Sequence, residues 1–367
     1  MKNTLKFVPE KDRELYIIDE LKKFTIERMT LNPNQSFEEV LEDFQTRNSH
    51  ITTDKYITNT LHMWFNSIFK QQEIKKIIST QNFEEAIFHD FNTIEFSPNF
   101  VNSYKISLSE KDWQLSLESL SLQNNIAWNF SNPFASLKLE HNKTIYRVSL
   151  VHFSILNSNF SKVFIRRHNN NSYPLEMFIN DESINVALLK KIVKDKKNVI
   201  ICGSTGSGKT SLLKSLLTNI SNESHCVTIQ DVDELGMLSD NHSSLISEKN
   251  SNTSLTELCS YTLRMSPERI ILGEIRGEEI TPFILSSNSG HKGMMSTIHA
   301  NNALDAINRL ATLFCVYQTD IRINFEHISK IITESIDIII YMENKKIKEI
   351  IKIIGKNNEN IIYDKIV

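Results

Sequence analysis

The sequence lacks the features of a membrane-embedded protein, of a secreted protein and of a protein stabilised by a structural metal ion. Its four cysteines lie far apart and form no CxxC pair, which argues against a zinc knuckle and against a disulfide framework. The longest nearly apolar run, 336–342, is interrupted by Asp337 and is far shorter than the ~20 residues that a spanning helix needs. The first residues contain no apolar signal core, so we expect a cytoplasmic protein without a transmembrane segment.

The charge balance gives no indication of a nucleic-acid-binding protein. The chain has 41 basic and 44 acidic residues, a formal net charge of −3, so a global basic field is absent and only a local patch stays possible. Its 367 residues are 40% hydrophobic, which is enough for two or three domains that each bury a core.

The N-terminal part predicts two different modules. Residues 1–76 indicate a helical extension, since Ser36 and Glu39 form a capping box and apolar residues at helical spacing recur in three segments. Residues 77–167 contain short apolar runs separated by Asn, Ser and Pro, a texture typical of a mixed α/β domain. The polar segment 168–182 is then expected to be an exposed linker.

The C-terminal part, 183–367, predicts a nucleotide-binding α/β domain. Segments with strand and helix patterns alternate there, which is typical of a parallel sheet with helices on its faces. Three final apolar runs, at 336–342, 347–354 and 361–367, are separated by turn-like stretches and predict a terminal β-meander.

A glycine-rich loop provides the main chemical signal. The stretch GSTGSGKT follows the apolar run 199–202 and precedes a leucine-rich amphipathic segment, the strand–loop–helix setting of a phosphate-binding loop. Lys209 would reach the β and γ phosphates of ATP, and the Thr210 hydroxyl would bind Mg²⁺. The expected nucleotide-binding residues are Gly203, Ser204, Thr205, Gly206, Ser207, Gly208, Lys209, Thr210 and Ser211.

Two predicted strands after the loop deliver acidic side chains at their C-terminal ends. The first is followed by Gln230, Asp231 and Glu234, and the second, RIILG, by Glu274. Ligand groups of open α/β sheets gather at that edge. These acids are therefore candidates for orienting water, accepting its proton or assisting Mg²⁺.

A third motif contains His291 and His299. A metal site is disfavoured, because two histidines eight positions apart have no third convergent ligand. We expect one histidine, together with Thr297, to contact phosphate, whereas the alternative is a pair of buried, hydrogen-bonded histidines.

Four motifs in order carry a resemblance over roughly residues 145–367. The stretches GSTGSGKT, TIQDVDEL, LRMSPERIILGEIRG and GHKGMMSTIHAN resemble the Walker A motif, Asp box, Walker B motif and His box of the type II/type IV secretion ATPase family. The resemblance implies a RecA-like P-loop ATPase domain behind a PAS-like N-terminal domain. Within the family, the chain resembles the type IV secretion and tight-adherence pilus branch in three features. Its histidines are eight positions apart, it has no four-cysteine zinc module, and it has a helical extension.

The resemblance also implies roles for single residues. Glu274 matches the Walker B acid and, with Thr210, would hold Mg²⁺; His291 and His299 match the His box. TIYRVSL and KVFIRRH resemble the stretches that supply nucleotide-contacting arginines, which makes Arg147 and Arg166 candidates. Gln230 departs from the family, which usually has glutamate there. Asp231, Glu234 or Glu274 would then have to accept the proton.

The expected function is that of a cytoplasmic homo-hexameric ATPase at the inner membrane. By resemblance it would couple ATP hydrolysis to pilus assembly or type IV secretion, and it would reach the membrane through platform or channel proteins. Because of Gln230, an alternative is an ATP-binding regulatory subunit with weak or no hydrolysis. An unrelated phosphate-loop kinase is disfavoured, because no feature that would bind a phosphate acceptor is evident.

Overall fold

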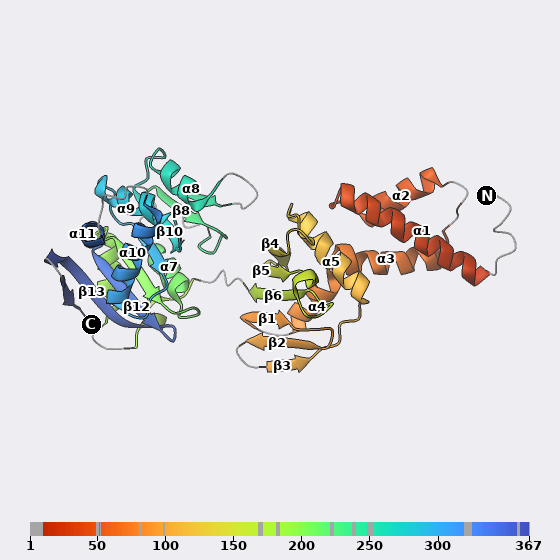
Figure 1. Cartoon of the computed structure of the whole chain (residues 1–367), viewed down its shortest axis with the longest axis horizontal. Coiled ribbons are helices and arrows are strands. Elements are labelled where there is room, and N and C mark those ends of the chain that lie inside the picture. Colours follow the sequence, from red (N-terminus) through yellow and green to blue (C-terminus); the bar gives the residue numbers. More distant parts are fainter. Residues whose placement is uncertain are drawn as a thin grey trace. The chain divides into compact units, whose positions relative to one another are not determined.

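The computed structural model divides into two compact units, Met1–Asn169 and Asn170–Val367, which are described separately (Figure 1). It describes residues 10–48, 51, 53–80, 83–97, 100–167, 172–180, 184–220, 224–236, 240–247, 253–318, 325–357 and 360–366. Residues 168–171 and 181–182 of the predicted linker lie outside these residues. Its described part contains the short 3₁₀ helix η3 (Leu175–Phe178).

The first unit contains the helices α1 (Glu10–Leu31), α2 (Phe37–Arg47), α3 (Lys55–Phe69), α4 (Gln72–Thr80) and α5 (Glu110–Gln123). Three of them begin at a side-chain N-cap, which is Ser36 for α2, Asp54 for α3 and Ser109 for α5. The capping box at α2 is confirmed, because the Ser36 hydroxyl accepts from the Glu39 N–H and the Glu39 carboxylate accepts from the Ser36 N–H. The three predicted helices are present, and α4 follows them. The predicted boundary at residue 76 falls inside α4.

A six-stranded antiparallel sheet forms the rest of this unit. Its order is β3-β2-β1-β6-β5-β4, and its strands are β1 (Glu85–Phe88), β2 (Thr93–Ser97), β3 (Phe100–Ser103), β4 (Phe134–His141), β5 (Thr144–Val151) and β6 (Lys162–Arg167). Helices α4 and α5 pack on one face through Ile74, Ile77, Trp113 and Leu117. Helices α1 to α3 form a second core with one another. Residues 77–167 contain the six strands and α5, as expected for a mixed α/β segment, whereas a domain that begins at residue 77 stays a prediction.

The second unit is built on one eight-stranded sheet of order β14-β13-β12-β7-β11-β10-β8-β9. Its strands are β7 (Val199–Gly203), β8 (Cys226–Gln230), β9 (His242–Ile246), β10 (Arg269–Ile275), β11 (Met295–Ile298), β12 (Ile338–Glu343), β13 (Lys346–Asn357) and β14 (Asn360–Lys365). All pairs from β12 to β9 are parallel, whereas β12, β13 and β14 pair antiparallel. The predicted α/β class and terminal β-meander are both confirmed.

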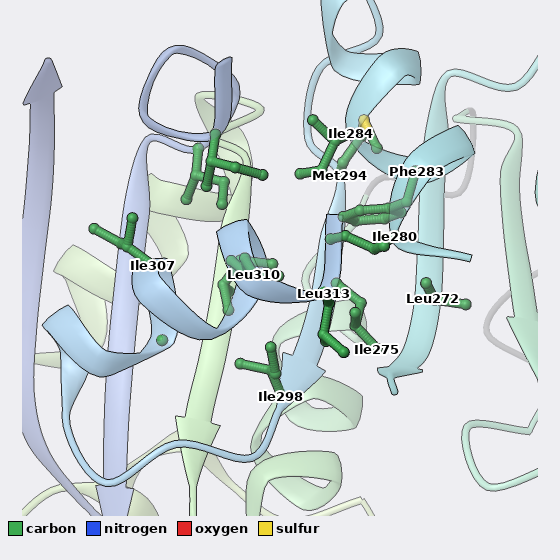
Figure 2. Packing of buried hydrophobic residues seen from close by; sticks show 14 of the residues in the cluster. Leu272, Ile275, Ile280, Phe283, Ile284, Met294, Ile298, Ile307, Leu310 and Leu313 are labelled. Carbon is green, nitrogen blue, oxygen red and sulfur yellow. The ribbon is translucent and has the colours of Figure 1, made fainter. Parts of the chain in front are cut away.

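Helices cover both faces of this sheet and fix the strand ends. They are α6 (Val186–Lys194), α7 (Lys209–Leu217), α8 (Leu255–Thr262), α9 (Ile280–Asn288), α10 (Ala303–Tyr317) and α11 (Phe325–Ser335). Figure 2 shows α9 side chains Ile280 and Phe283 and the α10 side chain Leu313 close to Ile275, the last residue of β10. This packing holds the end of β10, where the site residues begin, in one position.

The cysteines behave as buried apolar residues. All four are free, and three of them are fully buried. Burial raises the pKa of the Cys202 and Cys226 thiols to about 12, so they stay protonated at neutral pH. Among the described helices, none is long and apolar enough to cross a membrane.

Candidate nucleotide site

The phosphate loop joins β7 to α7, and its glycines are required by geometry. Gly203 has φ +153°, and a Cβ there would lie 2.3 Å from the Met342 carbonyl oxygen of the neighbouring strand β12. Gly208 caps α7 in the left-handed region, at φ +92°. Any other residue at these two positions would be strained or would clash, so the loop conformation depends on glycine.

Lys209 is the first residue of α7 and points back into the loop. Its side chain is buried, and its Nζ donates to the carbonyl oxygens of Gly203 (3.0 Å) and Ser204 (2.7 Å). Ser204, Thr205 and Gly206 are exposed at the tip of the loop, whereas Thr210 and Ser211 are half-buried in the first turn of α7. The ammonium therefore lies where the N–H groups of a loop and a helix N-terminus converge, the usual arrangement for binding phosphate.

Two buried polar atoms beside the loop have no hydrogen-bond partner among the described residues. They are the hydroxyl oxygen of Ser207 and Oε1 of Glu274. An unsatisfied buried polar atom costs about 1–3 kcal/mol, and a bound ligand, water molecule or ion is one way in which that cost is offset. The Ser207 hydroxyl fits a phosphate oxygen, and the Glu274 carboxylate fits a water molecule or, with the Thr210 hydroxyl, Mg²⁺.

Charged side chains from three strand ends meet at this edge of the sheet. Arg276 Nε and Nη2 lie 2.8 and 2.7 Å from Glu274 Oε2, and Arg276 Nη1 lies 3.1 Å from Asp231 Oδ2. On the other side of the carboxylate, Glu274 Oε1 is 2.8 Å from His299 Nε2, a contact that does not have the geometry of a hydrogen bond. His299 Nδ1 in turn lies 3.3 Å from Lys209 Nζ. The result is a continuous chain of contacts from Asp231 to the phosphate loop.

This arrangement determines the protonation of His299. Burial, and next the nearby Lys209 ammonium, lower the pKa of His299. Because the ammonium can only donate, Nδ1 is the acceptor, and the proton of the neutral ring lies on Nε2, facing Glu274. Burial lowers the pKa of Arg276, but Glu274 and Asp231 outweigh it and the net shift is upward.

The structure separates the two histidines of the third motif. Strand β11 runs parallel to β7, with Ile298 opposite Cys202, so His299 follows the strand at the loop edge and His291 precedes it at the other end. His291 Nδ1 lies 3.2 Å from the Ser286 carbonyl oxygen. Thr297 is buried and donates to the Gly273 carbonyl, so the expected phosphate contact is wrong for this residue. The catalytic role of His291 stays a prediction, and no contact between His291 and the phosphate loop is found among the described residues.

Gln230 supports the loop of Asp231 and Glu234. It is buried, and its Oε1 accepts the backbone N–H groups of Glu234 and Leu235, both at 2.9 Å. Its Nε2 lies 3.5 Å from Asp233 Oδ1. Glu234 is half-buried near Lys214, whose Nζ donates to the Glu234 carbonyl at 3.3 Å. Gln230 therefore holds the backbone of this loop in place, and its buried amide is not exposed to orient a water molecule.

Two residues that organise the site, Arg276 and Glu279, were not predicted from the sequence. Arg276 links Asp231 to Glu274, and Glu279, which is buried, accepts the backbone N–H groups of Arg276 (2.5 Å) and Gly277 (2.7 Å). A signal for Arg276 was available, because it follows the strand-end acid Glu274 by two positions. Glu279 could not be found from sequence, since its role depends on the fold of the turn.

The predicted arginines belong to the first unit and lie side by side within it. Arg147 in β5 pairs directly with Arg166 in β6, on the face of the sheet opposite the buried Val148 and Ile165. The Ser136 hydroxyl lies 3.4 Å from Arg147 Nε, and Glu85 Oε1 lies 3.7 Å from Arg166 Nε. Their contact with a nucleotide stays a prediction.

A family model confirms the resemblance of the motifs. The type II/IV secretion system protein family matches residues 135–343, more than half of the chain. The chain belongs to this family. The matched range includes the phosphate loop, Asp231, Glu274 and both histidines, and it also contains Arg147 and Arg166.

Single relatives agree with this assignment. A type IV secretion system protein VirB11 of Bartonella quintana is 39% identical over 132 residues, which cover 35% of the chain and 37% of that relative. The chain thus spans less than half of the relative's length. The ATPase DotB of Yersinia pseudotuberculosis has a similar fold (TM-score 0.55, 17% identity, 80% of this chain and 78% of that chain). The pilus retraction motor PilT with bound ADP is similar as well (TM-score 0.54, 17% identity, 80% and 81%).

Proposed function

We propose that the protein is an ATP-hydrolysing motor that assembles as a homo-hexamer and drives pilus assembly or type IV secretion at the inner membrane. One observation carries the proposal: the contacts from Lys209 through His299 to Glu274 join the phosphate loop to a strand-end carboxylate with an unsatisfied oxygen. Relatives named as type IV secretion proteins support the biological setting. The RecA-like and PAS-like assignments of the two domains belong to the same proposal.

The residues of the site divide the work of hydrolysis. The N–H groups of the loop and Lys209 bind the β and γ phosphates. To do so, the Lys209 ammonium gives up its hydrogen bonds to the carbonyls of Gly203 and Ser204 and donates to phosphate oxygens instead. Mg²⁺, held by Thr210 and Glu274, would neutralise charge on the phosphates. Glu274 Oε1 orients the attacking water. Arg276 holds the other oxygen of that carboxylate, so the carboxylate cannot rotate freely.

Two further groups complete the proposed site. Asp231, fixed by Arg276 and by the loop that Gln230 supports, is available to receive the proton of the water. Arg147 and Arg166, from the same chain or from a neighbour in the ring, would neutralise charge on the transferred phosphoryl group. Platform or channel proteins would bring the ring to the membrane.

The test is Mg²⁺-dependent ATP hydrolysis by the full-length chain. Lys209→Ala should abolish hydrolysis and weaken nucleotide binding. Glu274→Gln should abolish hydrolysis and keep binding, since the loop N–H groups and Lys209, which bind the phosphates, are unchanged. Glu278→Gln is the matched control, because Glu278 is an exposed carboxylate four residues away. Hydrolysis that survives in Glu274→Gln would contradict the mechanism, and a strictly monomeric protein with and without an ATP analogue would contradict the ring.

A further inference from the structure

The first unit contains a basic cavity that plays no part in the proposed hydrolysis. It lies between the end of α3, the polar face of α4 and the end of β4, and its volume is about 530 Å³, within the usual range for small-molecule sites. All of its lining side chains are polar, and none is a carboxylate. They are Asn66, Lys70, Gln72, Lys75, Lys76, Ser79 and His141.

The cavity is shaped by a rigid turn between two helices. Gln71, the residue between α3 and α4, adopts a left-handed conformation with φ +48°. Its buried amide donates to the carbonyls of Ile68 and Phe69, both at 3.2 Å, and this fixes the turn. Because Ile74 and Ile77 pack into the core, the helical period places Lys75 and Lys76 on the side of the cavity.

The positive charges of the cavity are not compensated by the protein. None of Lys70, Lys75 and Lys76 forms an ion pair with another residue in the part of the chain that the structure describes. Burial, and next the charge of Lys70, lower the pKa of Lys75. Glu73, an acid of α4, is buried on another side of the helix and accepts the Ser107 N–H at 2.9 Å.

His141 completes the lining from the opposite wall. Its Nε2 lies 2.7 Å from the Ser79 hydroxyl, which itself donates to the Lys75 carbonyl at 2.7 Å. Because that hydroxyl proton is already used, the imidazole Nε2–H is the donor to Ser79. Burial and the nearby Lys75 lower the pKa of His141. The wall thus adds hydrogen-bonding capacity and no negative charge.

We propose that this cavity binds a small soluble anion that carries at least two phosphate groups. Three ammonium groups at one cavity repel one another, and a multiply charged anion removes that repulsion while it accepts their hydrogen bonds. Ammonium groups on flexible stems are common phosphate ligands. A single phosphate would leave part of the charge uncompensated, whereas a polyphosphate matches the number of donors and the volume.

The test uses the full-length Lys209→Ala chain, so that binding at the phosphate loop does not obscure the second site. Calorimetric titration with inorganic tripolyphosphate should show one site per chain. Lys75→Gln should weaken it about tenfold, the usual effect of removing a charge-assisted hydrogen bond, and Lys70→Gln with Lys75→Gln should weaken it further. Lys55→Gln, an exposed lysine at the other end of α3, should leave the affinity within about twofold.

A second arm separates a soluble ligand from a lipid headgroup. Sedimentation with phosphatidylglycerol vesicles, compared with phosphatidylcholine vesicles, is measured for the same variants, and thermal unfolding verifies that each variant is folded. Vesicle binding that Lys75→Gln abolishes, without any tripolyphosphate binding, would overturn the soluble ligand and assign the phosphate to lipid. Absence of binding in both arms, or equal weakening by Lys55→Gln, would overturn the site.

Discussion

Arg147 and Arg166 lie directly opposite each other in the antiparallel pair β5–β6, on the face of the sheet that does not contribute to the core. Like charges that pair across strands destabilise a sheet. Among the described residues, Glu85 forms an ion pair with Arg166 at 3.7 Å, and no ion pair is found for Arg147. Such a pair of arginines is favourable when an anion binds to both guanidinium groups.

Alanine at either arginine should therefore reduce turnover. We expect kcat for ATP hydrolysis to fall about 10³-fold in Arg147→Ala and in Arg166→Ala, with nucleotide affinity changed far less, because the charge they neutralise develops during phosphoryl transfer. The matched control is Arg167→Ala, whose side chain alternates to the other face of β6. An equal loss of kcat in Arg167→Ala would contradict the assignment of the role to the two arginines on the exposed face of the sheet.

Gln230→Glu should not increase turnover. The carboxylate would still accept the N–H groups of Glu234 and Leu235, but it would face the Asp233 carboxylate, 3.5 Å from the present amide nitrogen. We expect equal or lower kcat, with recovery in the double variant Gln230→Glu, Asp233→Asn. A many-fold rise above the unmodified chain would instead support the regulatory-subunit alternative. Steady-state kinetics of the unmodified chain, the single variant and the double variant decides between these outcomes.

His299 should make the folded state sensitive to acid. Its pKa is lowered from 6.5 in the folded chain, so the unfolded chain takes up a proton first as the pH falls. The free energy of unfolding is therefore unaffected by His299 above about pH 6.5. It decreases as the pH falls from there to the folded-state pKa of His299, because only the unfolded chain is protonated in that range. Thermal unfolding midpoints from pH 7.5 to 5.5 should fall less steeply in His299→Asn. Identical pH slopes would contradict the assignment.

Phe283 should be important for the stability of the second unit. It is 3% exposed and packs among Ile275, Ile280 and Leu313 (Figure 2). Phe283→Ala should lower the free energy of unfolding by about 3–5 kcal/mol, as truncation of a core aromatic usually does. Leu285→Ala, at an exposed position of the same helix, should cost less than about 0.5 kcal/mol. Denaturant unfolding of both variants measures the difference.

Local patterns in the sequence predicted the features that short segments determine by themselves. The capping box of Ser36 and Glu39, the phosphate loop and the three terminal strands each depend on residues that are neighbours in the chain. For the same reason the edge of the sheet at which Asp231 and Glu274 lie could be predicted, since parallel strands present their C-terminal ends together.

The remaining features depend on contacts that no local pattern contains. Gln230 differs from an exposed amide only because the following loop folds over it, and Arg276 has its role because β8 and β10 are neighbours. The two histidines of one motif are separated because a strand runs between them. The role of Thr297 changed because its hydroxyl reaches the carbonyl of the next strand.

Because β7 pairs with a strand near the end of the chain, the phosphate loop can take its final conformation only late in protein synthesis. Strand β7 lies between β11 and β12, and Gly203 pairs with Met342, which is synthesised 139 residues later. Until that segment has left the ribosome, β7 lacks one of its two neighbours and the base of the loop is incomplete. A nascent chain that ends before β12 should therefore bind no ATP, so we expect the nucleotide site to form only when almost all of the chain has been made.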